Sequence, residues 1–491
     1  MRIETFGAKA HFPLPLYAVY PDYKVSFLST MIPYKHMKVD VLIIGGGGGA
    51  YPAAFKLAGS GKTVLMADPK GVLGGNCLYL GCIPSKTVRE LIEINERSGR
   101  LLGSKNHADF SSIQKHKDDV QQIRFDQHDR EMSEFKNLEF LKGTVSFTGR
   151  NSADVSTEDG KVSVEFDYAI IATGTVVSRI SFPGSDLCIT SDDIFSFGTA
   201  FRNIPDKMVI VGGGYIALEV AGMFHMLGTE VHLFVRTETV LRNVDQDLVK
   251  IAYPLITPFR VHLNTSIRDV TGKRGKLKIN YTENGEDMEM EAGEVLLAVG
   301  RKGVVPDGID LTGVKYSSKG IIEVSDTLQT NIPNIYATGD ITGRTPYFHA
   351  AVRESLVAAN NIMGQHEDRM DFLNVPVSIF TYPPVSYIGI LRNEAKEKGM
   401  DIVETSYAMS GDARAQMYEE QDGEIRLFFD RKTGRIVGGW VVGLDAPELI
   451  NEIGTAVFNS LTVMDMARFP DQHPTTNEGV SKAARAWNGP E

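Results

Sequence analysis

The chain has 491 residues, of which 42% are hydrophobic and 23% charged, and its formal net charge is −11. This length is too great for one hydrophobic core and predicts about two to four domains. The negative charge argues against a nucleic-acid surface, which requires a basic field. No apolar run reaches the roughly 18–20 residues that span a bilayer. We therefore expect a soluble cytoplasmic protein with neither nucleic acid nor a membrane as a partner.

Residues 1–36 contain several tyrosines and prolines but show no clear hydrophobic period. A signal peptide would need a compact apolar core and a small-residue cleavage site, and neither is present. We interpret this segment as an extension ahead of the folded protein, because a strong strand follows Met37 at once. The alternative is an arm that targets an organelle or binds a partner, so its role stays open.

The first strong pattern is a buried-type strand, 39–44, that runs into glycines and then into a helix. It fits G-x-G-x-x-A at Gly45, Gly47 and Ala50. In a dinucleotide site the first glycine turns the chain tightly and the second lets the backbone approach a pyrophosphate, while the small third residue lets helix and strand pack. The next strand ends at Asp68, whose carboxylate is able to accept both hydroxyls of an adenosine ribose. FAD fits this unit.

Two of the three cysteines, Cys77 and Cys82, stand five positions apart. This is not a secreted disulfide framework, and it indicates a pair kept for chemistry in a reducing compartment. Pro84 suits the first turn of a helix, so Cys82 would lie near a helix N-terminus, where a thiolate is stabilised. A metal site or two unrelated buried thiols are the alternatives, but zinc requires four ligands and no second cysteine pair exists. The third cysteine, Cys188, is expected in the core.

The strand, glycine turn and helix return near the middle of the chain. Here the strand 208–211 precedes Gly212, Gly214 and Ala217. A single match is also typical of an ordinary strand–turn–helix, but two matches in the same context favour two dinucleotide sites.

The residue that closes the next strand differs between the two units. In the second unit the strand 231–234 ends at Val235 and Arg236, where an acid was expected, and Arg242 follows six residues later. Two guanidiniums are able to clamp a 2′-phosphate with charge-assisted hydrogen bonds. We therefore favour NADP(H) over NAD(H) in this unit. The alternative is that both arginines form a solvated face.

The remaining chain completes the predicted fold. Residues 84–141 read as mostly helical, and short β-type runs dominate 145–171 and 261–299. From about residue 378 strands and helices alternate without a glycine-rich phosphate loop, which indicates a different domain from about residue 371. The predicted class is α/β, with two Rossmann-like dinucleotide-binding domains and a C-terminal α+β domain.

With these blocks in place, the chain resembles the pyridine nucleotide–disulfide oxidoreductases over nearly all of residues 38–485. The block G-G-x-C-x-x-x-G-C-x-P-S-K at 74–86 is highly specific. Other blocks follow in the family's order at 172–174, at the second glycine loop, and at 298–301, 337–340 and 473–478. The resemblance implies FAD domain segments at 37–180 and 303–370, an NAD(P) domain at 181–302 and a dimerisation domain at 371–491.

The resemblance also implies roles for single residues. Cys82 would face the flavin as a thiolate, Cys77 would exchange with the substrate disulfide, and Lys86 would lie near the flavin and pair with Glu219. The further cofactor contacts that it implies are Gly75, Gly143, Thr173, Gly174, Asp340, Phe348 and His349 for FAD, and Tyr215, Ile267 and Gly300 for the nicotinamide nucleotide.

His473 and Glu478 stand in a Pro-Thr-x-x-Glu context. An imidazole beside a carboxylate is a proton shuttle, because the carboxylate fixes the tautomer and raises the basicity of the ring. In relatives this dyad reaches the cysteines of the other subunit, so the resemblance implies an obligate homodimer.

Within the family, Cys-Ile-Pro-Ser-Lys and the run His349-Ala350-Ala351 are most like dihydrolipoamide dehydrogenase. Ala217 and the two arginines of the second unit are more like glutathione reductase, and Asp471 and Gln472 replace the histidine that usually precedes the dyad. The leading hypothesis is a dehydrogenase of small dithiols or of a lipoyl domain. The alternatives are an NADPH-dependent reductase of a small disulfide and a non-catalytic assembly subunit of a 2-oxoacid dehydrogenase complex.

Overall fold

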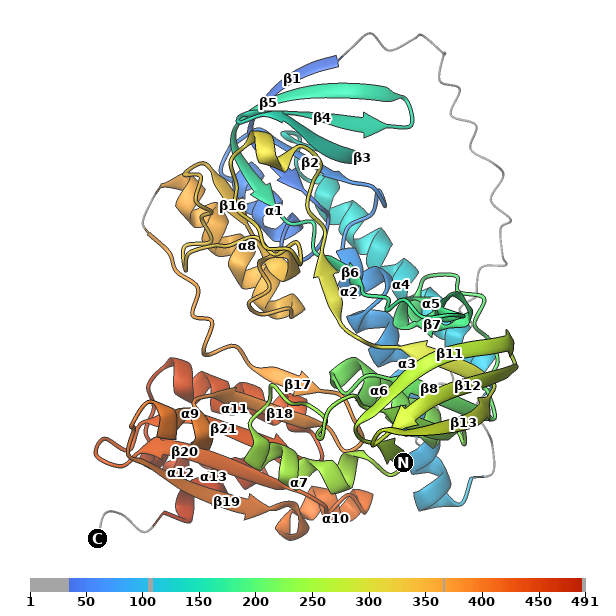
Figure 1. Ribbon diagram of the computed structural model, residues 1–491. Helices are drawn as coiled ribbons and strands as arrows, with labels where there is room; N and C mark the ends of the chain where they lie inside the picture. The colour runs from blue at the N-terminus through green and yellow to red at the C-terminus, as the bar shows by residue number, and fades with distance from the viewer. Residues whose placement is uncertain (1–34, 105–108, 365–366, 488–491) are drawn as a thin grey trace, which may run out of the picture.

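The computed structural model describes residues 35–104, 109–364 and 367–487. Most of the predicted N-terminal extension, residues 1–34, lies outside the described residues. Residues 35 and 36 do not belong to an extension, because the backbone of strand β1 (Lys35–Ile44) already pairs there with Val162 and Ser163 of β5. Figure 1 shows three bodies, one around β1 at the top and two below it.

The first body is built on a six-stranded sheet. Its strands are β1, β2 (Val64–Asp68), β3 (Leu138–Gly149), β4 (Ser152–Thr157), β5 (Gly160–Ile171) and β16 (Ile335–Ala337). β1 lies parallel to β2 and β5, and β16 returns from far along the chain to lie parallel to β5. Residues near 335 therefore complete the sheet that residue 35 begins.

Successive residues of β1 point to opposite faces of this sheet, as strand geometry requires. Val41 and Ile43 pack with helices α1 (Tyr51–Gly59) and α8 (Phe348–Met363). Leu42 and Ile44 pack on the other face with β4 and β5. Because both faces are covered, the strand is a continuous apolar run rather than an alternating one.

The second body repeats this plan. Its parallel sheet has the order β10-β9-β8-β14-β7, and a three-stranded antiparallel sheet, β11-β12-β13, packs beside it. The strands are β7 (Ile189–Thr190), β8 (Lys207–Val211), β9 (Glu230–Phe234), β10 (Arg260–His262), β11 (Thr265–Lys273), β12 (Lys276–Glu283), β13 (Glu286–Ala292) and β14 (Glu294–Leu297), with helices α5 (Ser191–Phe195), α6 (Tyr215–Met226) and α7 (Gln246–Ile256). The predicted β-rich region 261–299 is confirmed. Cys188 is buried in this body, as expected.

Two connections join the first two bodies. In a short antiparallel ribbon, β6 (Thr175–Val177) leads from the first body to the second and β15 (Arg301–Gly303) leads back. The helices α2 (Gly75–Tyr79), α3 (Cys82–Leu102) and α4 (Phe110–Ser133) reach from the first body toward the second (Figure 1).

The third body is an antiparallel sheet with the order β17-β18-β21-β20-β19. Its elements are β17 (Val377–Ile379), β18 (Val385–Gly389), α9 (Arg392–Glu397), β19 (Ile402–Ala408), α10 (Ala413–Tyr418), β20 (Glu424–Asp430), β21 (Ile436–Val442), α11 (Ala446–Phe458), α12 (Val463–Arg468) and α13 (Glu478–Arg485). Helices α11 to α13 cover one face. Trp440 and Phe428 on the other face share a core with α3, α6 and α7, so this sheet is fixed against both dinucleotide-binding bodies.

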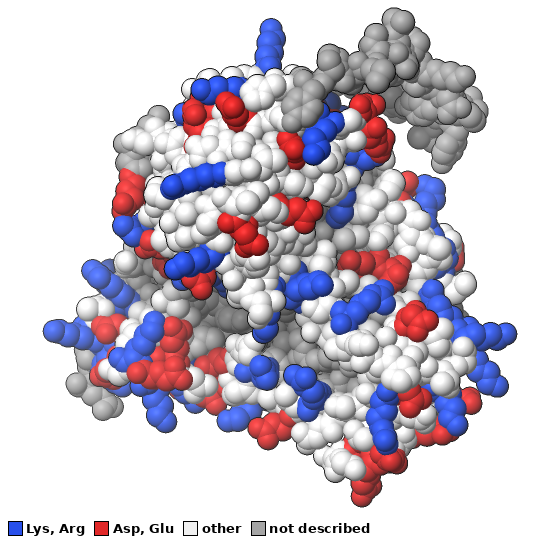
Figure 2. Space-filling model, turned by 45° about the horizontal axis from the view of Figure 1, so that its top comes forward, with Lys and Arg blue, Asp and Glu red and all other residues white. Residues whose placement is uncertain are grey.

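Acidic and basic side chains are interspersed over the face drawn in Figure 2. Among the described residues, none of the helices has the length and apolar composition needed to cross a membrane.

Candidate active site

A cavity of about 1060 Å³ lies where the first glycine loop, the helices α2 and α3 and the helix α6 meet. Its volume exceeds the roughly 300–1,000 Å³ of common small-molecule sites, so it suits an extended ligand. The predicted residues that line it are Gly45, Gly47, Asp68, Gly75, Cys77, Cys82, Lys86, Gly143, Thr173, Gly174, Tyr215, Glu219, Asp340, Phe348 and His349. Residues that are far apart in the sequence therefore line a single cavity.

Glycine contacts shape the floor of this cavity. Gly45 has φ +117°, and a Cβ there would lie 2.3 Å from the carbonyl oxygen of Ala172. A Cβ on Gly75, which has φ +55°, would lie 2.6 Å from the Cα of Gly47. Only glycine allows these backbones to approach so closely. The resulting side-chain-free cradle fits a pyrophosphate, and the fully buried Ala50 packs behind it.

Asp68, at the end of β2, is held both by the first glycine loop and by the residues that follow it. One carboxylate oxygen accepts the backbone N–H of Gly46 at 2.9 Å, and the other accepts that of Lys70 at 2.8 Å. The carboxylate is therefore fixed beside the glycine cradle, where a ribose that follows the pyrophosphate would lie.

The two cysteines lie on consecutive helices. Cys77 belongs to α2, a short helix that the sequence did not predict, and α3 begins at Cys82 as expected. Both are thiols in this structure, and their side chains are hydrogen-bonded. This hydrogen bond and burial raise the pKa of Cys77.

The same hydrogen bond and the charge of Lys86 hold the pKa of Cys82 below its usual range, although burial acts in the opposite direction. Cys82 is exposed to the cavity and Lys86 lies one helical turn later on the same face. The pair is therefore asymmetric, with Cys82 the better thiolate.

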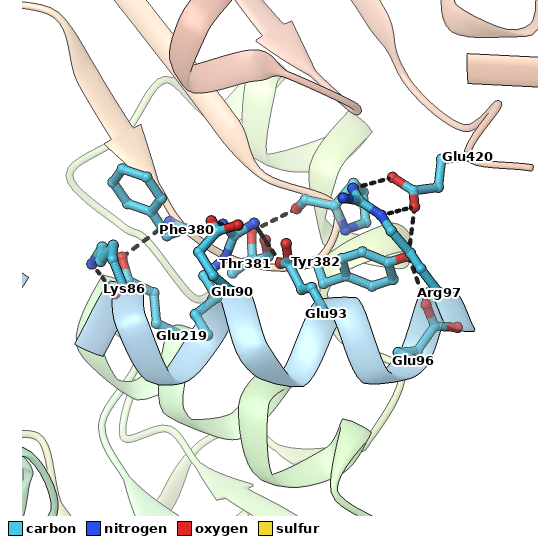
Figure 3. A network of polar contacts seen from close by, with 12 residues as sticks. Lys86, Glu90, Glu93, Glu96, Arg97, Glu219, Phe380, Thr381, Tyr382 and Glu420 are labelled. Atoms are coloured by element: carbon cyan, nitrogen blue, oxygen red, sulfur yellow. Dashed lines mark hydrogen bonds and ion pairs between the residues drawn. The ribbon is translucent and has the colours of Figure 1, made fainter. Parts of the chain in front are cut away.

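An ion pair joins α3 to the second body. The Nζ of Lys86 lies 2.8 Å from Oε2 of Glu219, which comes from α6 and is nearly buried. The other carboxylate oxygen of Glu219 accepts the backbone N–H of Phe380 at 3.0 Å, and Lys86 lies 4.4 Å from the centre of the Phe380 ring. Figure 3 shows that these residues meet at one end of α3.

The far end of α3 is tied to the third body as well (Figure 3). Arg97 donates to both carboxylate oxygens of Glu420 at 2.7 and 2.9 Å. The hydroxyl oxygen of Tyr382 lies 3.0 Å from Glu96 and 2.9 Å from Glu420, so its one proton is shared between the two carboxylates. Between the two ends, buried Arg89 lies 2.6 Å from Glu93 and donates to the carbonyl of Thr381. The helix that carries Cys82 is thus held along its whole length.

Thr175 is a site residue that the sequence did not reveal. Its hydroxyl donates to Asp340 at 3.0 Å and accepts from Arg301 at 2.8 Å, and its carbonyl accepts from Asn76 at 2.6 Å. It therefore links the first turn of α2, which carries Cys77, to Asp340. Its position directly after the 172–174 block was the available signal, whereas no local signal marks Phe380.

Glu354 is a second unpredicted residue, fully buried behind the Asp340 turn. Its carboxylate accepts the backbone N–H of Gly339 at 2.6 Å and the hydroxyl of Thr345 at 2.9 Å. Burial raises the pKa of Glu354 to about 7. The carboxyl therefore shapes the turn that places Asp340 in the cavity.

The second glycine loop lies outside the lining of this cavity, although Tyr215 at its end does line it. A Cβ on Gly212 would lie 2.2 Å from the carbonyl oxygen of Ala298, the same close approach that Gly45 makes to Ala172. Ala217 is fully buried, Gly214 immediately precedes α6, and Gly300 follows the Ala298 contact by two residues. The two predicted dinucleotide loops therefore share one construction.

The two arginines of the second unit lie beside this loop. The segment that carries them is held to it, because the N–H of Leu241 donates to the carbonyl of Gly213 at 2.7 Å. Arg236 and Arg242 are exposed, and neither forms an ion pair with any residue that the structure describes. Ile267 lies on β11 at the edge of the core of this body.

The histidine dyad is formed but lies apart from the cavity of its own chain. Nδ1 of His473 lies 2.9 Å from Oε1 of Glu478, which also accepts the N–H of Thr475 at 3.2 Å. The imidazole is 73% exposed, and neither dyad residue lines the cavity. The ring is therefore free to act on another surface.

The family model described as pyridine nucleotide-disulphide oxidoreductase matches residues 39–355, and the model of that family's dimerisation domain matches residues 375–484. The chain belongs to the pyridine nucleotide-disulphide oxidoreductases. It is a flavin-dependent enzyme of this family, with FAD as its cofactor. The predicted fold class and family are confirmed.

Curated relatives agree with this membership. The chain is 30% identical to a dihydrolipoyl dehydrogenase of Vibrio cholerae over 472 residues, which cover 93% of this chain and 97% of the relative. Identity is 31% to that of Vibrio parahaemolyticus, with the same coverage, and 29% to that of Bacillus subtilis, with 92% and 97% covered. A solved structure, the Cu(II) complex of the HOCl-induced flavoprotein disulfide reductase RclA from Escherichia coli, shares the fold with a TM-score of 0.82 at 22% identity, covering 92% of this chain and 99% of that one.

Lys86 makes a testable contribution to the thiolate at Cys82. Replacement Lys86→Met removes the positive charge that lowers the pKa of Cys82, so the pKa should rise. The pH midpoint for alkylation of Cys82 by iodoacetamide, followed by peptide mass spectrometry, should move to higher pH. Lys250→Met, on the exposed surface of α7, should leave the midpoint in place. An unchanged midpoint in Lys86→Met would contradict the electrostatic assignment.

Glu354 predicts a component of the pH dependence of stability. Because its folded pKa of about 7 lies above the usual 4.5, the proton bound in the folded state contributes stability at low pH that is lost as pH rises from 4.5 to about 7. The replacement Glu354→Gln does not ionise: its amide oxygen is able to accept the N–H of Gly339, and its NH2 group is able to donate to the hydroxyl oxygen of Thr345. Relative to this variant, the wild type should lose up to about 1.4 kcal/mol per pH unit across that window, measured by denaturation at several pH values. Parallel pH profiles for the two proteins would contradict the prediction.

Proposed function

We propose that the chain is a dihydrolipoyl dehydrogenase-like enzyme that transfers two electrons between a small dithiol or lipoyl group and a nicotinamide dinucleotide. The observation that carries this proposal is the asymmetric pair Cys77 and Cys82, held at the start of α3 in a cavity shared with the Lys86–Glu219 ion pair. The curated relatives are named dihydrolipoyl dehydrogenase, which supports the substrate class.

The reaction begins from the oxidised Cys77–Cys82 disulfide. A substrate thiolate attacks the sulfur of Cys77, a mixed disulfide forms, and the sulfur of Cys82 leaves as the thiolate that its surroundings favour. The second substrate thiol then attacks the substrate sulfur of the mixed disulfide. The cyclic disulfide leaves, Cys77 becomes a thiol, and the two electrons now reside on the cysteine pair.

The proton released by the substrate thiol requires a base. His473 is suited to this task, since Glu478 holds its Nδ1 and leaves the other ring nitrogen exposed. Because the dyad lies outside the cavity of its own chain, we propose that it serves the cysteines of a partner subunit in a homodimer. The match to the dimerisation domain supports this arrangement.

The bound FAD would supply two-electron exchange with the nicotinamide. We propose that it is held by the first glycine loop, Asp68 and the loop that ends at Asp340, while the second glycine loop and Tyr215 hold the nicotinamide nucleotide. The further contacts proposed from the resemblance are Gly143, Thr173, Gly174, Phe348 and His349 on the FAD side, and Ile267 and Gly300 on the nicotinamide side. We likewise propose the domain limits 37–180, 181–302, 303–370 and 371–491, which the return of β16 to the first sheet supports.

A second candidate, an NADPH-dependent reductase of a small disulfide, is favoured by Arg236 and Arg242, which lie beside the second loop without a carboxylate partner in the described chain. In that case the same pair of cysteines works in the reverse direction. A non-catalytic assembly role is disfavoured, because the cysteines, the Lys86–Glu219 pair and the His473–Glu478 dyad are all intact.

The proposal predicts turnover of lipoamide in a substrate matrix. Purified holoenzyme should oxidise dihydrolipoamide faster than reduced glutathione, and Cys77→Ser and Cys82→Ser should each lower kcat by about 1,000-fold or more, since either change removes the disulfide. Flavin reduction by the nicotinamide nucleotide provides the control for an intact cofactor site. Retained turnover in Cys77→Ser, or reduction of glutathione disulfide alone, would contradict the dehydrogenase assignment.

The cofactor preference is a separate prediction. The double variant Arg236→Ala and Arg242→Ala should reduce kcat/KM for NADP(H) relative to NAD(H) by about 10–100-fold, because each guanidinium would lose charge-assisted bonds to the 2′-phosphate. Arg150→Ala, an exposed arginine on the first body, is the matched control. A wild-type preference for NAD(H), unchanged by the double variant, would show that the arginines only form a solvated face.

A further inference from the structure

One face of α4 supplies buried polar side chains at helical spacing. Gln114 donates to the carbonyl of Ile194 at 3.1 Å, and Lys117 donates to the carbonyl of Ser196 at 2.5 Å. One turn later, fully buried Gln121 donates to the carbonyls of Leu78 and Tyr79. Residues three and four apart share a face, so the residues that follow on this face are aimed at the same region.

Gln121 holds α4 against α2, the helix that carries Cys77. Its two hydrogen bonds, at 2.8 and 3.0 Å, end on the residues directly after Cys77. α4 packs beside both α2 and α3 (Figure 1). Arg124 follows Gln121 by three residues, which is about 4.5 Å along the helix axis, and both Arg124 and His128 line the cavity that contains Cys77.

Tyr51, the first residue of α1, lies beside this face of α4. Burial raises the pKa of Tyr51, the positive charge of Arg124 lowers it, and the charges of Cys77 and Glu131 raise it. The Tyr51 ring lies 4.8 Å from the ring of His128. This face of α4 therefore borders the start of α1 as well as α2.

Among the described residues, the hydrogen-bond partner of Arg124 is an uncharged side chain. Its guanidinium donates to Oε1 of Gln127 at 2.7 Å, and Gln127 in turn donates to Glu131. Glu131 also contacts Nδ1 of His128 at 3.1 Å. This arrangement orients one nitrogen of Arg124 and leaves the charge without a paired carboxylate. Glu131 is the acidic residue that acts on this charge, but it is already bound to Gln127 and His128. The guanidinium has five N–H donors, so it retains donors that an anion in the cavity can accept.

We infer that Arg124 recognises a carboxylate on the substrate that reacts with Cys77. The substrate class is a small disulfide or dithiol with an anionic tail, such as free lipoate, in preference to the amide-linked lipoyl group. This inference rests on the proposed function, because it names the substrate of the same cysteine pair. Arg124 is a specificity-determining residue, since it binds the tail and takes no part in sulfur exchange.

The first test measures anion recognition at Cys77 without turnover. In the reduced Cys82→Ser holoenzyme, where Cys77 is the remaining thiol of the pair, the ionised fraction of Cys77 displaces iodide from anionic iodoacetate or from neutral iodoacetamide, and peptide mass spectrometry assigns the modified residue. Because both reagents meet the same ionised fraction at one pH, the ratio of their rates reports on the charge around Cys77. The ratio of the two rates should fall about fivefold or more in Arg124→Gln, as expected for the loss of one charge-assisted contact. Arg124→Lys should retain most of the ratio, and Arg130→Gln, an exposed arginine on the same helix, should not change it.

The second test measures substrate choice. The ratio of kcat/KM for lipoate to that for lipoamide should fall by about tenfold in Arg124→Gln, again with Arg130→Gln as the control. Equal losses for both substrates, or an unchanged alkylation ratio, would overturn the inference and assign Arg124 to folding or to the dimer interface. Failure of lipoate and lipoamide to turn over while the alkylation ratio still falls would overturn the proposed function and support anion recognition at Cys77.

Discussion

The ion pair between Lys86 and Glu219 is the constraint on which the site depends. It joins a helix of the first body to a helix of the second, and Glu219 also accepts the backbone N–H of Phe380 from the third. A buried carboxylate needs both partners, because an unpaired charge is expensive away from water. The same lysine lowers the pKa of Cys82 one turn earlier on α3. A single interaction therefore fixes three bodies around the cysteines and sets the chemistry of one of them.

The helix α3 distributes this constraint along its length. Its later turns bind the third body through Arg89, Arg97 and the carboxylate of Glu420. A rigid helix is useful here because thiol–disulfide exchange requires the sulfur atoms to be in line, and small displacements of a reacting group are costly. Helix α2, which carries Cys77, is also held in place, through Gln121 on α4 and through Thr175. The cysteine pair thus lies on a rigid support rather than on a free loop.

The two glycine loops share one backbone construction. Gly45 and Gly212 make the same close approach to a carbonyl oxygen of a neighbouring segment, Ala172 in one case and Ala298 in the other. The loops differ at the end of the next strand, where Asp68 closes the first unit and Arg236 stands near the end of the second. The backbone geometry is therefore repeated in the second unit, whereas the charge of the side chain after the next strand is not.

The sequence alone determined the elements that depend on neighbouring residues in the chain. Backbone sterics require the glycines of both loops, burial on two faces makes β1 a continuous apolar run, and the cysteine spacing and Pro84 predict the start of α3. Only the tertiary structure decided which distant side chains meet. Phe380 and Thr381 reach α3 because a sheet formed much later in the chain packs against it, and Arg124 reaches the Cys77 side because buried hydrogen bonds fix α4 there. Such contacts join residues far apart along the chain, so no local period or motif encodes them.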